Sequence, residues 1–338
     1  MRRSTESSRP IHIVTGGAGF IGSNIAAELD SRGEDIVLVD TLGREDRKWR
    51  NIAKRRLRDL ITPDEVPSFL AGRRGIDSVI HMGAISTTTE RDVDLIVRNN
   101  FRLSVDLWNW CATESVPYIY ASSAATYGDG GNGFEDAFED SALAKLRPLN
   151  PYGWSKHVFD RWVRAEQDAG RTAPPKWAGL KFFNVYGPNE YHKGDQRSVA
   201  IQMFEQVRDS DAARLFKSDN PDYPDGGQMR DFVWIGDCVS VALWLLDADS
   251  APSSVYNVGS GAARTFEDKA RITFELLGKP VNIEFIDLPD KLRGKYQYFT
   301  LASLDKLRRA GYDKTTTSLE DGLKAYIHGY LMSGDSFR

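Results

Sequence analysis

The sequence is poor in the residues that build disulfide frameworks and metal centres. Only two of its 338 residues are cysteines, Cys111 and Cys238, and they stand far apart without a Cys-x-x-Cys pair or a Cys/His cluster. The five histidines are scattered without the spacing of metal ligands: His12, His81, His157, His192 and His328. These absences argue against a disulfide-stapled protein, a zinc site and a metal hydrolase, and they predict two buried, inert thiols.

The sequence also lacks a strong net charge and an apolar run near its start. Its formal net charge is -4, which predicts no general affinity for nucleic acid or for an anionic membrane. The opening stretch MRRSTESSRP contains a twin arginine, but no apolar run follows it, so it indicates neither a signal peptide nor a membrane anchor. We therefore expect the protein in the cytoplasm.

What the sequence does contain is a glycine-rich turn directly after its first apolar stretch. Gly16, Gly19 and Gly22 have the spacing G-x-x-G-x-x-G, and the preceding IHIV is typical of a buried strand. Glycine allows a tight turn and lets main-chain N–H groups touch a ligand, while a helix that begins near Phe20 points its positive end at that ligand. The pattern therefore predicts a pyrophosphate-binding turn.

A second apolar stretch, IVLV, ends in Asp40. An acidic residue about 20 positions past the glycines is where a dinucleotide-binding fold places the group that hydrogen-bonds an adenosine ribose. Aspartate also starts ordinary loops, which is the simpler interpretation of Asp40. The strand, the glycine turn and the acid occur together in the expected order, and this favours a dinucleotide site.

Strand and helix patterns continue to alternate through the first part of the chain. Residues 77–84 predict a strand, residues 99–114 an amphipathic helix, and residues 117–128 a strand that ends in serines. Such alternation builds a parallel sheet covered by helices on both faces. The predicted fold class is therefore α/β, with a doubly wound parallel sheet of the Rossmann type.

Tyr152 and Lys156 lie four residues apart in a predicted helix, downstream of Ser122 and Ser123 at the predicted strand end. Positions i and i+4 share a helix face, so the phenol and the ammonium can point into one cleft. A nearby ammonium and a positive nicotinamide ring favour the phenolate, so the tyrosine could exchange a proton near neutrality. An ordinary amphipathic surface helix has the same spacing, and only the glycine turn makes the pair persuasive.

Several motifs resemble the extended short-chain dehydrogenase/reductases that act on nucleotide sugars: TGGAGFIG, SSAATYG and YGWSK. Within that group, longer stretches are similar to the ADP-L-glycero-D-manno-heptose 6-epimerases: YASSAATYG, FFNVYGPNEYHKG, RDFVWIGD, KYQYFT and AGYDK. The resemblance runs from about residue 11 to residue 330, and HKG is its most discriminating piece. It implies an isomerase that inverts C6 of an ADP-heptose for the inner core of lipopolysaccharide.

The resemblance also implies roles for individual residues. Tyr152 and Lys193 would be the two acid/base groups, with Lys156 and Ser123 in support of Tyr152. The implied substrate contacts are Ser123, Asn184, Asp195, Gln202, Phe216, Arg230 and Tyr296. The implied cofactor contacts are Gly16, Gly19, Phe20, Ile21, Gly22, Asp40, Thr41, Lys48, Met82, Gly83, Ala84, Ile85, Ser86, Asn99, Tyr152, Lys156 and Val185. The resemblance also suggests a closed homo-oligomer, while the scattered histidines and the small net charge predict no metal, no nucleic acid and no membrane partner.

Three features depart from the family pattern, and all of them concern substrate contacts. Asp195 stands where a small serine is expected, and Gln202 stands where a histidine is expected. The loop over residues 215–228 is longer than in the family.

Two nicotinamide cofactors remain open from the sequence. Asp40 would repel a 2′-phosphate and so favours NAD, but the family uses NADP with an equivalent acid present. A cationic stretch after Thr41 could hold the phosphate, with Lys48 as its best-placed member: Arg44, Arg47, Lys48 and Arg50. We expect NADP, with NAD as the alternative.

Several residues also have simpler interpretations. Lys193 could bind a substrate phosphate or be a solvated loop residue. Arg230, which suits bidentate pyrophosphate recognition, could instead pair with Asp231 or Asp237, and Tyr296 could be a packed aromatic.

Other functions remain open as well. A nucleotide-sugar 4-epimerase differs mainly in the Lys193 segment. A non-catalytic dinucleotide-binding regulator is disfavoured because Ser123, Tyr152 and Lys156 occur together. A 4,6-dehydratase is disfavoured because residues 124 and 125 are alanines where that type of enzyme has an acidic pair.

We predict two domains with the cleft between them. The dinucleotide-binding domain would comprise residues 1–182 with about 232–257 and 298–312. A smaller α/β substrate domain would comprise about 183–231, 258–297 and 313–338.

Overall fold

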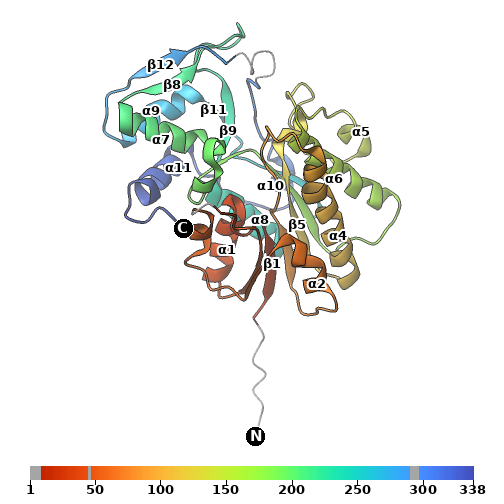
Figure 1. Ribbon diagram of the computed structural model, residues 1–338. Helices are drawn as coiled ribbons and strands as arrows, with labels where there is room; N and C mark the ends of the chain where they lie inside the picture. The colour runs from red at the N-terminus through yellow and green to blue at the C-terminus, as the bar shows by residue number, and fades with distance from the viewer. Residues whose placement is uncertain (1–8, 45–46, 290–296) are drawn as a thin grey trace.

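The computed structural model describes residues 9–44, 47–289 and 297–338, and its main feature is a large parallel sheet with helices on both faces (Figure 1). This sheet has seven strands in the order β10-β6-β5-β4-β1-β2-β3, and all neighbouring strands are parallel. The strands are β1 (Ile11–Thr15), β2 (Asp35–Val39), β3 (Asp59–Ile61), β4 (Ser78–His81), β5 (Tyr118–Ser123), β6 (Trp177–Phe182) and β10 (Ser254–Val258). The α/β, Rossmann-type prediction is confirmed.

The strand order reverses at β1, which lies between β2 and β4. Thr15, the last residue of β1, pairs with Val39 of β2 on one side and with His81 of β4 on the other. The carboxyl ends of these three strands are therefore level at the reversal point, which is where open α/β sheets bind ligands.

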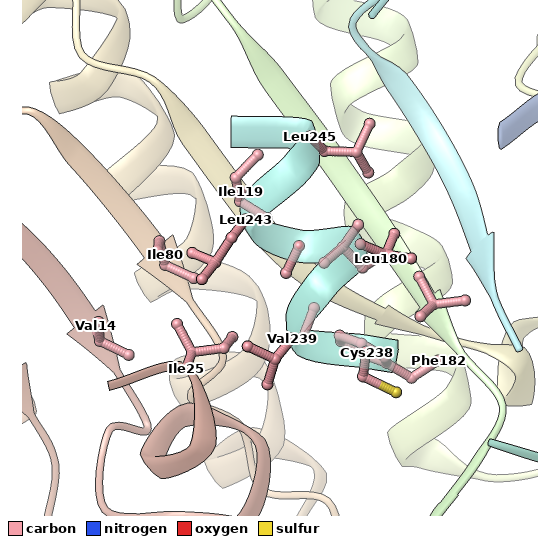
Figure 2. Close-up of a cluster of buried hydrophobic side chains, with 14 of the residues drawn as sticks. Val14, Ile25, Ile80, Ile119, Leu180, Phe182, Cys238, Val239, Leu243 and Leu245 are labelled. Carbon is pink, nitrogen blue, oxygen red and sulfur yellow. The ribbon is translucent and has the colours of Figure 1, made fainter. Parts of the chain in front are cut away.

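Strand residues alternate between the two faces of the sheet. Val14, Ile80 and Ile119 pack in the cluster formed with α1 (Phe20–Ser31) and α8 (Ile235–Asp247) (Figure 2). Their neighbours in sequence pack on the opposite face with α4 (Leu103–Glu114) and α6 (Pro151–Asp168): Ile13, Val79 and Tyr118. Both faces are apolar because both are covered.

Two of the helical segments around this sheet position the site: the run over residues 93–114 and α6. The helix predicted over residues 99–114 belongs to a continuous helical run over residues 93–114, and the Tyr152 stretch lies in α6, as predicted. The segments are η1 (Lys48–Ile52), η2 (Pro63–Glu65), α2 (Val66–Leu70), α3 (Val93–Ile96), η3 (Val97–Arg102), α4 (Leu103–Glu114), η4 (Ala124–Tyr127), α5 (Asp140–Leu143), α6 (Pro151–Asp168) and α10 (Asp305–Arg309).

A smaller region lies beside the large sheet and contains two small sheets (Figure 1). One has the order β11-β9-β7, and the other pairs β12 with β8. The strands are β7 (Asn184–Tyr186), β8 (Ala213–Phe216), β9 (Met229–Trp234), β11 (Ala263–Thr265) and β12 (Ile283–Ile286). The helical segments are η5 (Tyr191–Gln196), α7 (Val199–Ser210), α9 (Phe266–Leu276), α11 (Leu319–Tyr326) and η7 (Ile327–Leu331).

The predicted segment 232–257 serves both parts of the molecule. It supplies α8 and β10 to the large sheet layer, while β9, at its start, pairs with β7 and β11. The exact division into two domains stays a prediction. Cys111 and Cys238 are both buried, as expected.

Candidate active site

The glycine turn connects β1 to α1 at the carboxyl edge of the large sheet. Gly16 has a φ of +63°, and a Cβ atom on it would lie 2.7 Å from the Cα atom of Gly83. A Cβ atom on Gly22 would lie 2.2 Å from the carbonyl oxygen of Gly16. The helix begins at Phe20, as predicted, and its N-cap Gly19 has no side chain to satisfy the first helical N–H groups. These groups are therefore available to an anion.

Asp40 follows β2 and faces this turn. Its Oδ2 atom accepts a hydrogen bond of 2.9 Å from the main-chain N–H of Ala18, and its Oδ1 atom accepts one of 2.7 Å from that of Thr41. The ammonium of Lys48 lies 2.5 Å from Oδ1 and donates to the carbonyl oxygen of Thr41. The predicted ribose acid and the predicted phosphate cation thus form one ion pair.

His192 lies near both lysines of interest at this edge. The pKa of His192 is lowered to about 4, chiefly by burial and in addition by the charges of Lys48 and Lys193. The Nδ2 atom of Asn51 lies 3.2 Å from its Nδ1 atom. The cationic stretch after Asp40 and the HKG segment therefore meet around one imidazole.

The predicted cofactor contacts at residues 82–86 form the loop after β4. The buried side chain of Asn100 holds this loop, accepting a hydrogen bond of 2.8 Å from the main-chain N–H of Ile85 and donating one of 3.0 Å to its carbonyl. Asn100 also donates to the hydroxyl of Ser155 in α6 at 3.0 Å. Asn99, the implied residue, donates to a carbonyl one helical turn earlier. The sequence pattern missed Asn100, which ties this loop to α6.

Ser123 and Tyr152 come together where the end of β5 touches the start of α6. Asn150 caps α6 by accepting a hydrogen bond of 2.8 Å from the main-chain N–H of Gly153. A Cβ atom on Gly153 would lie 2.7 Å from the carbonyl oxygen of Ala125, so α6 packs directly on the turn after Ser123. This close contact permits the hydrogen bond between the Ser123 and Tyr152 side chains.

The pKa of Tyr152 is shifted in the direction opposite to the one that the sequence led us to expect. Burial raises the pKa of Tyr152, and the hydrogen bond with Ser123 lowers it only in part. Loss of water around a phenolate thus outweighs the help expected from Lys156. Burial lowers the pKa of Lys156 to about 8, and the carboxylate of Asp160 opposes that shift. Lys156 therefore still carries a charge at neutral pH.

An ion pair that the sequence pattern did not reveal lies deeper along α6. The ammonium of Lys181 lies 2.7 Å from the Oδ2 atom of Asp160, and both side chains are fully buried. Tyr120 and Ser122 of β5 donate hydrogen bonds of 3.0 and 2.8 Å to the same carboxylate. The pair fixes α6, with Tyr152 two turns earlier, against β5 and β6.

Lys193 lies in η5, and its ammonium is 5.6 Å from the ring centroid of Phe20, the first residue of α1. Burial lowers the pKa of Lys193, and the nearby carboxylate of Glu190 opposes this effect. A lowered pKa is what proton exchange by a lysine requires. The fold therefore brings the HKG segment to the glycine turn. Three implied cofactor contacts pack against one apolar cluster: Ile21, Met82 and Val185.

Apart from Ser123, the implied substrate contacts that the structure describes are spread over the smaller region. Asn184 begins β7 with an exposed side chain, and Phe216 ends β8. Arg230 in β9 donates to the main-chain carbonyls of Met229 and Gln297. Tyr296 lies outside the described residues.

The two residues that depart from the family pattern share one surface hollow. Asp195 and Gln202 line a cavity of about 330 Å³ beside α7, together with Arg197 and Glu205. Gln202 donates a hydrogen bond of 2.7 Å to the carbonyl oxygen of Arg197, so it also closes the turn before α7.

Comparisons with known proteins agree with this geometry. The family model described as "NAD dependent epimerase/dehydratase family" matches residues 12–259. The chain belongs to that family. ADP-L-glycero-D-manno-heptose-6-epimerase of Nitratidesulfovibrio vulgaris is 48% identical over 331 residues, which cover 97% of this chain and 100% of the relative.

Solved structures in the epimerase/dehydratase family have the same fold. ADP-L-glycero-D-manno-heptose-6-epimerase of Helicobacter pylori has a TM-score of 0.78 and 26% identity, covering 97% of this chain and 99% of the other. UDP-glucose 4-epimerase of Thermus thermophilus, in complex with NAD, has a TM-score of 0.70 and 26% identity, covering 94% and 98%. Both 6-epimerases and 4-epimerases share the fold, so the choice between them depends on residues of the site.

Membership of this family confirms two predictions: the fold is one that binds a nicotinamide dinucleotide, and the protein is an epimerase, which is a type of isomerase. No helix in the part of the chain that the structure describes is both long and apolar enough to cross a bilayer. Across residues 9–44, 47–289 and 297–338, no three histidine, cysteine or acidic side chains gather to hold a metal ion.

Proposed function

We propose that the protein inverts C6 of ADP-D-glycero-D-manno-heptose, giving the L-glycero epimer, with NADP as its bound cofactor. The observation that carries this proposal is the position of Lys193. It supplies a second group with a lowered pKa at the glycine turn, in addition to Tyr152. The names of relatives that are 44% to 48% identical over nearly the whole chain support the same substrate.

The residues present fit a nicotinamide dinucleotide. Cβ atoms on Gly16 and Gly22 would strike main chain, so these glycines allow the tight packing of the turn, and uncapped N–H groups at the start of α1 suit a pyrophosphate. The ion pair between Lys48 and Asp40 supports NADP, because the acid is already neutralised and the ammonium can face a 2′-phosphate.

The chemistry follows from the stereocentre. C6 of a heptose bears no acidic C–H, so proton removal from carbon cannot invert it. When bound, the nicotinamide supplies oxidation at C6 and reduction of the resulting ketone from its opposite face. The two C6 alcohols point in different directions, so each needs its own proton partner on the protein.

We assign these partners to Tyr152 and Lys193. Ser123 shares the Tyr152 proton through its hydrogen bond, and the charge of Lys156 favours the phenolate when Tyr152 gives up that proton. When one epimer is oxidised, Lys193 takes its hydroxyl proton as a neutral amine. When the same epimer is formed in the reverse direction, Lys193 donates a proton to its oxygen as an ammonium. Burial lowers the pKa of Lys193 and so makes the neutral amine more accessible.

Turnover with defined nucleotide sugars tests the proposal. Purified protein is incubated with ADP-D-glycero-D-manno-heptose, and the configuration at C6 is followed by NMR. We expect conversion to the L-glycero epimer with no added cofactor. Inversion at C4 of a UDP-hexose, with ADP-heptose unchanged, would identify a 4-epimerase instead, and no turnover of either would favour a non-catalytic regulator.

The other predictions fit this function but depend on separate experiments. We predict that the protein supplies heptose to the inner core of lipopolysaccharide and that it is located in the cytoplasm. We also predict that it forms a homo-oligomer and that it binds its substrate between the two domains.

A further inference from the structure

Residues 335–338, here called the C-terminal segment, lie beside α1 (Figure 1). The guanidinium of Arg338 donates a hydrogen bond of 2.7 Å to the carboxylate of Glu28 in α1. The ammonium of Lys54 donates one of 2.5 Å to the carbonyl oxygen of Phe337. The segment is thus attached to the part of the molecule that contains the glycine turn.

The same segment contacts the stretch that leads into Lys193. The ring of Phe337 meets the ring of Tyr191 edge to face, with centroids 5.1 Å apart. The hydroxyl of Tyr191 donates a hydrogen bond of 2.6 Å to the carbonyl oxygen of Ser336. Tyr191 is only two residues before Lys193, so these contacts act on the η5 turn itself.

Asn189 joins the two sets of contacts. It has a φ of +74°, in the left-handed region that asparagine tolerates better than most residues. Its Oδ1 atom accepts a hydrogen bond of 3.0 Å from the main-chain N–H of Arg338, and its Nδ2 atom donates one of 3.0 Å to the hydroxyl of Ser23 in α1. Its carbonyl accepts one of 3.0 Å from Asn51, which also donates to the carbonyl of Ala18 in the glycine turn at 2.8 Å.

We propose that the C-terminal segment is a positioning element for Lys193, which it holds against the glycine turn by closing the η5 stretch onto α1. This inference rests on the proposed function, in which Lys193 exchanges a proton with one epimer. A shift of about 1 Å in a catalytic group can cost about a hundredfold in rate, so contacts outside the cleft can set turnover.

The test compares the full chain with a variant that stops after Gly334. We expect the truncated protein to lose about tenfold to a hundredfold in kcat for epimerisation, with KM nearly unchanged. An ADP-sugar with an aldehyde at C6 separates the two proton partners, because one molecule is reduced to the alcohol while another, as its hydrate, is oxidised to the carboxylate without inversion. We expect the truncated protein to retain this dismutation, which Tyr152 can support, together with its bound dinucleotide.

Point variants give the same test without truncation. Phe337→Ala removes the ring contact with Tyr191 and should give a smaller loss of kcat in the same pattern. Glu284→Gln is the matched control, because it removes the charge of an exposed ion pair with Arg214 in the β8–β12 sheet, outside the C-terminal segment, and should leave kcat unchanged. Melting curves of each variant verify folding.

The outcomes separate this proposal from the proposed function. Unchanged kcat in both the truncated and Phe337→Ala proteins would overturn it. So would equal losses of epimerisation, dismutation and dinucleotide, because the segment would then only stabilise the fold. An unaltered chain that does not epimerise at all would refute the proposed function, and this inference with it.

Discussion

The ammonium of Lys48 lies 2.5 Å from the carboxylate of Asp40, at the place where the adenosine ribose of a dinucleotide is expected. Lys48→Met leaves Asp40 without this cation, and a free carboxylate repels a 2′-phosphate. We expect the variant to release NAD, or less dinucleotide, where the unaltered protein releases NADP. Denaturation of the purified proteins and chromatography of what they release measures this.

Arg44→Met is the control for that measurement, because Arg44 is an exposed cation of the same stretch. It should release the same dinucleotide as the unaltered protein. Release of NAD alone by the unaltered protein would refute the NADP assignment.

Tyr152→Phe removes one hydroxyl and should keep the fold and the bound dinucleotide. We expect epimerisation to slow by about a hundred- to ten-thousandfold, the range typical for loss of a general acid/base group. Ser123→Ala should act more mildly, moving the acid side of the pH profile upward, because the hydrogen bond with Ser123 lowers the pKa of Tyr152. Near-normal turnover by Tyr152→Phe would show that another group exchanges the proton.

The alkaline side of the pH profile should report Lys156. Its pKa is lowered to about 8, so its charge is present at neutral pH and is lost as the pH rises through that value. Turnover that needs this charge should fall there, and Lys156→Met should also raise the pH at which activity first appears. Lys156→Arg keeps a charge at all these pH values, so its alkaline limb should move upward. Identical profiles for all three proteins would argue against the coupling.

Lys193→Met separates the mechanism with two proton partners from one in which a single residue serves both faces of a rotating ketone. Methionine keeps a stem of similar bulk, so packing should change little. We expect strong loss of epimerisation, partial survival of C6-aldehyde dismutation through Tyr152, and unchanged dinucleotide content. Normal epimerisation would reduce the HKG segment to a substrate-binding loop.

The ion pair between Asp160 and Lys181 should be intolerant of a single change. Asp160→Asn leaves a fully buried ammonium unpaired, and we expect a loss of about 3–5 kcal/mol in the free energy of unfolding. Asp160→Asn combined with Lys181→Met removes both charges and should recover most of that loss. Denaturant midpoints for the three proteins measure this, and a double variant less stable than Asp160→Asn would contradict the argument.

Asp160 should also influence the pH dependence of turnover, and its negative charge fixes the direction of the effect. Its carboxylate raises the pKa of Lys156, so Asp160→Asn should lower that pKa and move the alkaline limb to lower pH.

Local spacing was enough to predict the parts of the site that lie within one structural unit. The glycine turn, Asp40 and the pair Tyr152 and Lys156 are each set by the geometry of a single turn or helix. The placement of Lys193 at the glycine turn was implied only by resemblance, because nothing in its own neighbourhood in the sequence points to Phe20.

The residues that organise the site were not predictable in this way. Asn51 bonds to the carbonyl of Asn189 from 138 positions away, and Asn100 bonds to Ser155 across 55 positions. An asparagine has the same appearance in a sequence whether it caps a loop or lies on the surface. Gly153 carried a weak signal, since a glycine inside a helix start indicates a close neighbour, here the carbonyl of Ala125.

The strand order has a consequence for how the chain acquires its fold during synthesis. β6 is fully buried along its length, yet its outer neighbour β10 begins only at Ser254, after β7, β8 and β9 of the smaller region and α8 have been made. Until then, β6 is an apolar edge with unpaired main-chain groups, and such edges are prone to pair with other chains. The nascent protein therefore passes through a period of high aggregation risk on the ribosome, and that period ends only when a segment from far downstream arrives.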